Sequence, residues 1–186
     1  MAAKSNLRNM LLCLTGVCLV CSAILGSVYV LTEKPIEQAN LNILKRSISE
    51  VLPEGGVLST SQCCEYSGLS YEYYTLSENG QVIAYAVKTS EVGFGGPISL
   101  MVGVLPDGTV YKTSVLSHSE TPGLGAKCKT DENFISQFCN LTPDKKIQVK
   151  KDGGDLDAIT GSTITSRAYS AAVSKAVELV KYLGEK

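Results

Sequence analysis

The chain has 186 residues, of which 44% are hydrophobic, and its formal net charge is −1. This length accommodates one domain of ordinary size together with an additional segment. The balanced charge argues against a nucleic-acid-binding protein, which needs a strongly basic surface, and nothing in the composition indicates disorder.

An uncharged apolar run extends from Met10 to Leu31. About twenty helical residues cross a hydrocarbon core, whereas the apolar region of a cleaved secretory signal usually has roughly 7–15 residues. We therefore expect an uncleaved transmembrane helix over residues 10–32, preceded by a cytoplasmic N-terminus at residues 1–9. Lys4 and Arg8 place the basic bias before the run, so the remainder of the chain should be extracytoplasmic in a single-pass protein of the cell inner membrane.

Three cysteines lie inside this run. Cys13, Cys18 and Cys21 have the spacing of plant-type iron–sulfur ligands. Those ligands occupy an irregular loop, whereas this run is a continuous apolar helix, so we expect the three to behave as small hydrophobes. We predict no metal site within this chain; a cluster shared with another membrane subunit stays an alternative.

The other four cysteines lie beyond the apolar run. Cys63 and Cys64 are adjacent, and adjacent cysteines rarely pair with each other because the geometry is strained. Either one is a candidate for a bridge to Cys128 or Cys139, but the odd total of seven leaves the pairing undecided. An anaerobic source would leave all seven as thiols, and we favour this interpretation.

A second helical segment follows the apolar run. Beyond Pro35, apolar residues recur on roughly one side of a helix from Ile36 to Leu52, and the turn at Pro53 to Gly56 ends it. We interpret residues 33–56 as a membrane-proximal helical stalk. The extracytoplasmic domain then occupies residues 57–186.

The domain begins with β-rich sequence. Four runs are rich in Tyr, Val, Ile and Thr: Tyr71–Leu76, Gln81–Thr89, Ile98–Leu105 and Thr109–Leu116. Asn79-Gly80 and Asp107-Gly108 separate neighbouring runs and are hairpin signals. We predict an antiparallel meander of about four strands, and the poorly patterned residues 57–70 receive no strand.

The C-terminal half adds helices. Asp131 to Cys139 has a short helical pattern, and Ile147 to Lys150 is interpreted as a last strand. From Arg167 onward, apolar residues recur at three- and four-residue spacing, which predicts a helix with one buried face. The fold class is therefore α+β, with a mostly antiparallel twisted sheet and flanking helices.

The segment before the last helix, Asp157 to Thr165, is dense in hydroxyl groups and has a glycine hinge at Gly161. Unpaired backbone N–H groups at a helix N-terminus favour an anion such as a phosphate. An ordinary Ser/Thr-rich helix cap produces the same pattern, so spacing alone leaves both interpretations open.

The motif Asp157-x-x-Thr160-Gly161-Ser162-Thr163 resembles the flavinylation signal of the FMN-binding subunits of Rnf and Na⁺-translocating quinone reductase complexes. In that family a flavin transferase joins FMN to a threonine through a phosphoester, and the resemblance implies Thr163 as the acceptor. It also implies that the transferase reads Asp157. The family more often has Ala where this chain has Ser162, so Ser162 and Thr165 offer alternative hydroxyls.

A second motif lies upstream. Ser119-x-Thr121-Pro122-Gly123-x-Gly125 resembles the signature that lies against the flavin ring in the same family. The resemblance implies a cofactor-binding set: Glu120, Thr121, Pro122, Gly123, Leu124, Gly125, Thr160, Gly161, Ser162 and Thr165, in addition to Thr163. The Gly93 to Pro97 loop also resembles its counterpart in the family, and we expect a structural role for it.

Nearby charged residues receive smaller roles. Lys127 and Lys129 follow the second motif and would favour a reduced anionic flavin, but solvated surface charges are the commoner case. His118 is the single histidine, and a structural or surface role ranks above proton transfer.

Together these features cover nearly the whole chain and resemble the G subunits of Rnf-type complexes. The resemblance implies an electron-relay subunit with covalent FMN in a membrane-bound, ion-translocating ferredoxin:NAD oxidoreductase. Its partners would be the other subunits, the flavin transferase and the membrane, and it would have no catalytic residues for substrate turnover alone. Alternatives are the C subunit of a Na⁺-translocating NADH:quinone reductase, a free-standing anchored flavoprotein that reduces an extracellular acceptor, and a non-redox module whose threonine is unmodified.

Overall fold

The computed structural model describes residues 7–185. The chain divides into two compact units, Met1–Asn42 and Ile43–Lys186, and each is described by itself. Residues 1–6, which include Lys4 and most of the expected cytoplasmic N-terminus, lie outside the described range.

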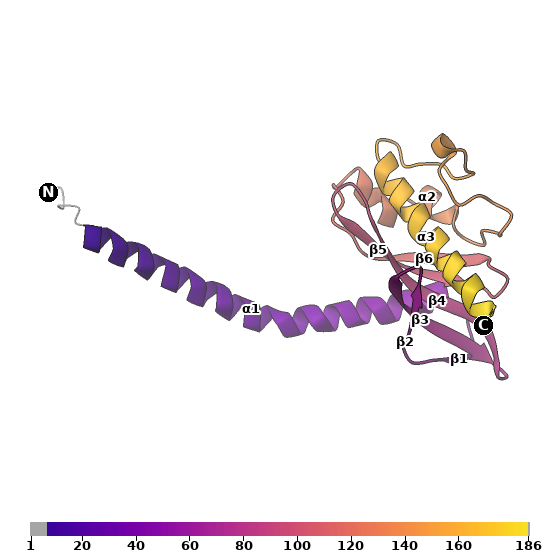
Figure 1. Cartoon of the computed structure of the whole chain (residues 1–186), viewed down its shortest axis with the longest axis horizontal. Coiled ribbons are helices and arrows are strands. Elements are labelled where there is room, and N and C mark those ends of the chain that lie inside the picture. The colour runs from indigo at the N-terminus through magenta and orange to yellow at the C-terminus, as the bar shows by residue number, and fades with distance from the viewer. Residues whose placement is uncertain (1–6, 186) are drawn as a thin grey trace. The chain divides into compact units, whose positions relative to one another are not determined.

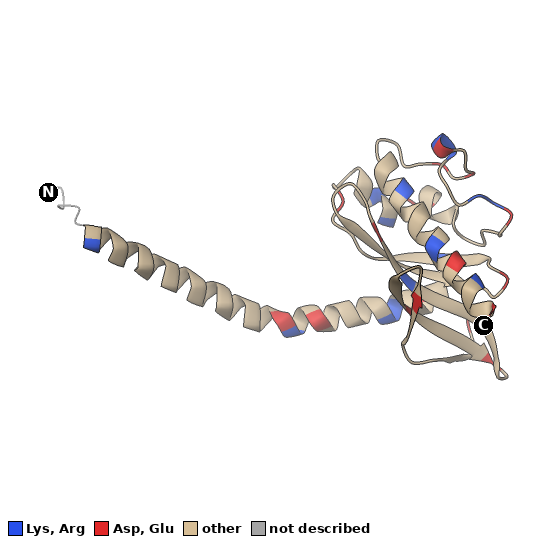
Figure 2. Cartoon of the chain, viewed as in Figure 1, with Lys and Arg blue, Asp and Glu red and all other residues tan. Residues whose placement is uncertain are grey.

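The first unit consists of the greater part of helix α1, Leu7–Val51 (Figure 1). Its described side chains are exposed throughout, and no charged residue occurs between Arg8 and Glu33 (Figure 2). An 18-residue window of this helix has a mean hydropathy of 2.3, and none of that window is buried. The helix is therefore long and apolar enough to cross a membrane.

Helix α1 continues through Pro35, where the sequence suggested a separate stalk. A proline inside a helix removes one backbone hydrogen-bond donor and normally kinks the helix. The boundaries that we expect at residues 32 and 56 stay predictions. However, the end of α1 belongs to the second unit, because Ser47, Ile48 and Val51 are buried there.

The second unit contains a six-stranded antiparallel sheet with the order β1-β3-β4-β5-β6, and β2 also pairs with β3. The strands are β1 Val57–Leu58, β2 Gln62–Tyr66, β3 Leu69–Glu78, β4 Gln81–Val92, β5 Pro97–Val104 and β6 Val110–Ser117. The predicted meander corresponds to β3 through β6 and is confirmed as part of the mixed α+β fold.

Turn residues act as expected in the β3–β4 hairpin. Asn79 and Gly80 both have positive φ angles, 51° and 81°. A two-residue hairpin loop of this kind matches the right-handed twist of the flanking strands. Ser67 and Gly68 repeat the arrangement between β2 and β3, with φ angles of 52° and 75°.

Three strand assignments differ from the sequence prediction. The expected last strand at Ile147–Lys150 is wrong, because Val149 makes only an isolated bridge to Leu156 and Lys150–Asp152 forms the 3₁₀ helix η2. Conversely, β1 and β2 form where no strand was expected. Both are short edge strands with mostly exposed side chains, so they lack the alternation of buried residues that marks a strand in sequence.

The sheet buries both of its faces. Helix α3, Thr163–Gly184, packs on one face, where Ala172, Val173 and Ala176 meet Val87 and strand β5. The end of α1 covers the other face in a smaller cluster, where Ile48 and Val51 pack with Ala84, Ala86 and Met101.

Two short helices complete the α3 side: η1, Gly125–Lys129, and α2, Glu132–Ser136. Asp131 caps α2 by accepting hydrogen bonds from the N–H groups of Asn133 and Phe134. The Phe134 ring meets that of Tyr169 of α3 edge to face, with 5.1 Å between the ring centroids. This contact fixes the loop that carries η1 against the start of α3, where the candidate site lies.

Candidate functional site

A cleft of about 380 Å³ lies in the second unit, where three segments meet and Lys151 of η2 adds to the lining. The segments are the Gly93–Pro97 loop, the loop that follows β6, and the turn into α3. The lining residues are Phe94, Glu120, Thr121, Leu124, Gly125, Lys151, Gly161, Ser162, Thr163, Ile164 and Thr165. Both sequence motifs therefore contribute to one cleft, although they are distant in sequence.

The Glu120 carboxylate connects the three segments. It is 5% exposed, and its Oε1 accepts a hydrogen bond from the N–H of Gly95 at 3.0 Å. Its Oε2 accepts a hydrogen bond from the Thr165 hydroxyl at 2.7 Å. A buried carboxylate needs such donors, since burial without them is costly. Glu120 therefore fixes the cleft walls to one another.

Glycines surround this carboxylate for steric reasons. A Cβ atom added at Gly93 would overlap Oε1 of Glu120, and one at Gly125 would overlap Oε2. A Cβ at Gly95 would overlap the Ser119 carbonyl oxygen. The Gly93 to Pro97 loop thus has the structural role expected of it, and its Phe94 also lines the cleft.

The turn into α3 carries several hydroxyl groups that differ in burial and in hydrogen bonding. Gly161 has a φ angle of 78°, which L-residues rarely adopt, and this turn leads directly to Ser162, the residue that caps α3. Ser162 is 7% exposed, lines the cleft and makes no side-chain capping bond. Thr163 is the first residue of α3 and is half-buried, and its hydroxyl lies 3.4 Å from Lys151 Nζ.

A smaller cleft of about 270 Å³ adjoins the same turn, and Lys151, Gly161 and Thr163 line both clefts. Asp157 and Thr160 line the smaller cleft. The Asp157 side chain is 67% exposed and pairs with Lys150 Nζ at 2.7 Å. Its backbone is anchored by Gln137, whose Oε1 accepts from the Asp157 N–H at 2.7 Å.

Most of the predicted cofactor-binding residues come together in the larger cleft. Pro122 and Gly123 are exposed and do not line it, although they belong to the loop that does. Thr160 lies in the adjoining cleft instead. The assignment of these residues to a cofactor stays a prediction.

Three lining residues were not predicted: Phe94, Lys151 and Ile164. Phe94 is 71% exposed and Ile164 is 49% exposed. The sequence signal that could have identified Phe94 as a cleft residue was an aromatic residue between two glycines. Lys151 sits in a run of charged residues, and its direction toward Thr163 could not be read from spacing.

The remaining candidates lie outside the cleft. Lys127 and Lys129 are exposed and do not line it. His118 accepts a hydrogen bond at Nδ1 from the Glu120 N–H at 3.3 Å, so it contributes to the local turn.

All seven cysteines lie in the described range and are unpaired. Cys128 is fully buried, and burial, with the nearby Glu120 charge, raises the pKa of its thiol to about 11. Cys128 is therefore a protonated, inert thiol at neutral pH. Residues 7–185 contain no group of three or more His, Cys, Asp or Glu residues placed to hold a metal ion.

The chain is similar to known proteins in sequence. The model of the FMN-binding domain family matches residues 93–178, which include all three segments of the cleft. Among solved structures, the C subunit of the Na⁺-translocating NADH-quinone reductase of Parabacteroides distasonis is 27% identical, with a TM-score of 0.47. That match covers 61% of this chain and 63% of the other.

Three sequence relatives match over most of their length. The G subunit of the proton-translocating ferredoxin:NAD(+) oxidoreductase complex of Clostridium ljungdahlii is 33% identical, covering 90% of this chain and 88% of the relative. The G subunits of the ion-translocating oxidoreductase complexes of Shewanella piezotolerans and Methanosarcina acetivorans are 35% and 30% identical. These matches cover 93% and 97% of this chain, and 88% and 97% of the relatives. The chain belongs to the family of G subunits of ion-translocating oxidoreductase complexes.

Proposed function

We propose that this chain is the electron-relay subunit of an Rnf-type complex, with FMN held by a phosphoester on Thr163. It is a membrane protein of a multi-subunit, ion-translocating oxidoreductase family. Its relatives' names describe ferredoxin:NAD(+) oxidoreductase and ion translocation, and we extend both activities to the complex that contains this chain. By the basic bias at its N-terminus, the domain is extracytoplasmic and the N-terminus cytoplasmic.

The cleft fits a flavin mononucleotide in size and chemistry. Its volume of about 380 Å³ lies within the range of small-molecule and cofactor sites, about 300–1,000 Å³. Apolar side chains of Phe94, Leu124 and Ile164 suit an aromatic ring system, whereas Ser162 and the first turn of α3 suit a phosphate. When bound, the flavin supplies the redox chemistry, and the protein positions it and excludes water.

The observation that carries the proposal is the position of the Thr163 hydroxyl. Of the cleft hydroxyls on α3, Thr165 is 1% exposed and already donates to Glu120. Ser162 is 7% exposed, so its oxygen is poorly accessible to an enzyme. Thr163 is half-buried at the border of the two clefts, within reach from both sides. These differences support Thr163 as the acceptor over its neighbours.

The test uses the full chain, produced with the flavin transferase of its own cell. Thr163→Val keeps the shape of the side chain and removes the ester oxygen. We expect the denatured wild-type band to fluoresce under ultraviolet light and the variant band to stay dark. Thr130→Val is the matched control, because it removes an exposed hydroxyl that lines neither cleft, and it should fluoresce fully. A fluorescent Thr163→Val band would move the acceptor to Ser162 or Thr165.

Asp157 is the proposed recognition residue for the transferase. Its exposed carboxylate in the smaller cleft is accessible to another protein. Asp157→Ala should therefore lower the modified fraction, as measured by intact mass. Lys150→Gln breaks the ion pair but leaves the carboxylate in place, so modification should persist in that variant. Equal losses in both variants would mean that the ion pair matters rather than recognition of Asp157.

Two alternatives are separated by purification. A chain that co-migrates with several polytopic membrane subunits in mild detergent supports the relay in a complex. A chain that purifies alone with bound flavin supports a free-standing anchored flavoprotein. A wild-type chain that stays dark in the presence of its transferase would overturn covalent attachment itself.

A further inference from the structure

The loop from Lys150 to Asp157 delivers one positive charge to the Thr163 hydroxyl. Lys151 Nζ lies 3.4 Å from Thr163 Oγ1, and Lys151 lines both clefts that meet at this residue. Within residues 7–185, Lys151 forms no ion pair, whereas its neighbours Lys150 and Arg167 do. Its charge is therefore free to meet an anion at Thr163.

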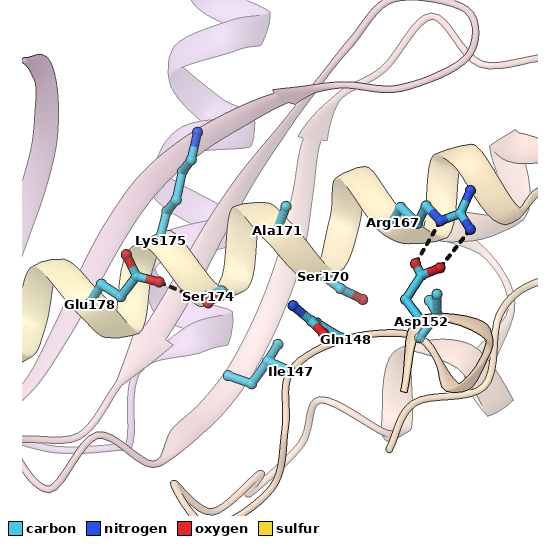
Figure 3. Close-up of a pocket in the computed structure, with 10 residues that line it drawn as sticks. Ile147, Gln148, Asp152, Arg167, Ser170, Ala171, Ser174, Lys175 and Glu178 are labelled. Carbon is cyan, nitrogen blue, oxygen red and sulfur yellow. Dashed lines mark hydrogen bonds and ion pairs between the residues drawn. The ribbon is translucent and has the colours of Figure 1, made fainter. Parts of the chain in front are cut away.

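The neighbouring charges are neutralised in pairs. Arg167 binds Asp152 through two hydrogen bonds of 2.6 Å each, from Nε and from an Nη atom (Figure 3). Lys150 pairs with Asp157 at 2.7 Å. The hydrogen bonds from Arg167 hold the pKa of Asp152 below its ordinary value, so the pair is intact at neutral pH. Arg167 stands one helical turn after Thr163, and this pair therefore attaches the loop to the first turns of α3.

Thr163 Oγ1 also lies where an anion finds other partners. It belongs to the first turn of α3, whose backbone N–H groups have no partner within the helix. Ser162 beside it is buried from an approaching enzyme, but it lines the cleft and makes no capping bond, so its hydroxyl can bond to a phosphate already attached at Thr163. A cation without an ion pair, a hydroxyl without a capping bond and a helix N-terminus thus lie at the same cleft as Thr163.

We propose that Lys151 is the cation that binds the phosphate oxygens at Thr163, and that the Asp152–Arg167 pair positions it. This inference rests on the function proposed above, because the anion is the phosphodiester on Thr163. A lysine acts there as a point charge with three donors, and it neutralises the single negative charge of a phosphodiester. In this transfer the transferase's flavin-dinucleotide donor loses its pyrophosphate bond, the Thr163 oxygen forms the new bond to the FMN phosphorus and gives up its proton, and a nucleoside monophosphate leaves. Lys151 favours this step by neutralising the charge on the phosphate oxygens.

The experiment measures the rate at which the full chain gains the mass of one FMN less one water, with its transferase present. Lys151→Gln removes the charge and should slow this gain by roughly threefold to tenfold, the loss expected for one partly exposed charge-assisted hydrogen bond. Lys151→Arg keeps the charge and should restore the rate. Lys145→Gln removes an exposed lysine that does not line either cleft, and it should change nothing.

Salt provides a readout that a structural role would not change. The wild-type rate should fall as ionic strength rises, and the rate of Lys151→Gln should fall less, because screening acts on the charge that this variant lacks. The melting temperature of the unmodified chain should be the same in both. For the positioning pair, Arg167→Gln should slow modification, and the double variant should be no slower than Lys151→Gln alone.

The outcomes separate the two proposals. A wild-type chain that is never modified overturns covalent attachment, and this inference with it. A modified wild type with Lys151→Gln modified at the same rate overturns the role of Lys151 alone. If the effects of Lys151→Gln and Arg167→Gln multiply in full, Arg167 acts independently of Lys151 and the positioning role is wrong.

Discussion

The two long helices of this chain treat their apolar residues in opposite ways. In α1, large apolar side chains from Leu7 to Ile43 are exposed, among them Leu11, Leu19 and Leu25 at 64–70%. In α3, the apolar face is buried, and Ala172, Ala176 and Leu179 have no exposed surface. One helix finds its apolar partner in the sheet of its own domain, whereas the other needs a partner outside this chain.

This difference separates a helix suited to a membrane from a helix that packs on a sheet. An 18-residue window of α1 has the composition of a membrane span, which requires only length and hydropathy. Helix α3 is bound by packing on a sheet and, at its first turn, by hydrogen bonds within the cleft. Sequence changes should therefore have opposite consequences in the two helices, as the following predictions specify.

The largest expected effect lies in the packed helix. Tyr169 is fully buried against Phe134 and Phe138, and its hydroxyl shares a hydrogen bond with Thr113 at 2.7 Å. Tyr169→Ala should lower the free energy of unfolding of the domain by about 3–5 kcal/mol, as for other large aromatic truncations. Urea denaturation measures this loss. Tyr169→Phe removes only the hydrogen bond and should cost about 1 kcal/mol; equal losses in both variants would contradict the packing account.

The next effect lies in the exposed helix. Leu19→Arg places a charge in the apolar run, which costs about 2.5–3.5 kcal/mol of insertion free energy at the centre of a span. The protein should leave the membrane fraction on alkaline extraction more readily than the wild type does. Ala171→Arg makes a similar change on the exposed side of α3, and it should alter unfolding by no more than about 0.5 kcal/mol. A Leu19→Arg chain that stays fully embedded would argue that the span tolerates charge by facing a polar subunit.

A third change tests whether the end of α1 behaves like α3. Gly103 of β5 faces Val51, and a Cβ there would overlap the Val51 carbonyl oxygen. Gly103→Ala should therefore force the last turn of α1 from the sheet and cost about 1–3 kcal/mol in urea denaturation. Gly184→Ala is the control, since a Cβ there has open space and the backbone has no positive φ angle. If Gly103→Ala costs no more than this control, the end of α1 is not fixed on the sheet.

The smallest effect depends on pH. Cys128 keeps its proton in the folded domain up to a pKa of about 11, whereas in the unfolded chain it loses that proton near its ordinary pKa of about 9. The folded state binds more protons between these values, so its stability falls as pH rises from about 9 to about 11. Urea midpoints measured at about pH 8 and about pH 10.5 should show a smaller fall in Cys128→Ala than in the wild type. Equal falls would assign the dependence to other groups, including Tyr169, whose pKa burial also raises.

Much of this fold can be predicted from local sequence. The α3 periodicity, the four β-rich runs and the Asn79-Gly80 turn each specify their structure over a short range, and each is present. Residues 147–150 were wrongly predicted as a strand because Ile147 and Val149, which are β-branched, precede a pair of lysines in the way that a strand end often does. In the structure the chain instead turns back on itself at Gly153 and Gly154. Strands β1 and β2 form by pairing with the edge of β3. The sequence of residues 57–66 alone does not reveal that pairing partner.

The site shows a similar division. The two motifs indicated which loops meet, but the residue that joins them could not be assigned its part from sequence. Glu120 was expected to contact the cofactor, and in the structure its carboxylate also connects Gly95 to Thr165 through hydrogen bonds. Lys151 was an ordinary member of a charged run until the fold of η2 directed it toward Thr163. Contacts between distant segments decide such roles, and spacing does not encode them.

The glycine-lined carboxylate also limits how this protein can be engineered or can diverge. Since Gly93, Gly95 and Gly125 leave no room for a methyl group, a change in any one loop must be accommodated by the other two. Chimaeras that exchange a single loop between relatives should therefore misassemble, whereas exchange of all three together should preserve the cleft. The three loops of the cleft therefore form one structural unit.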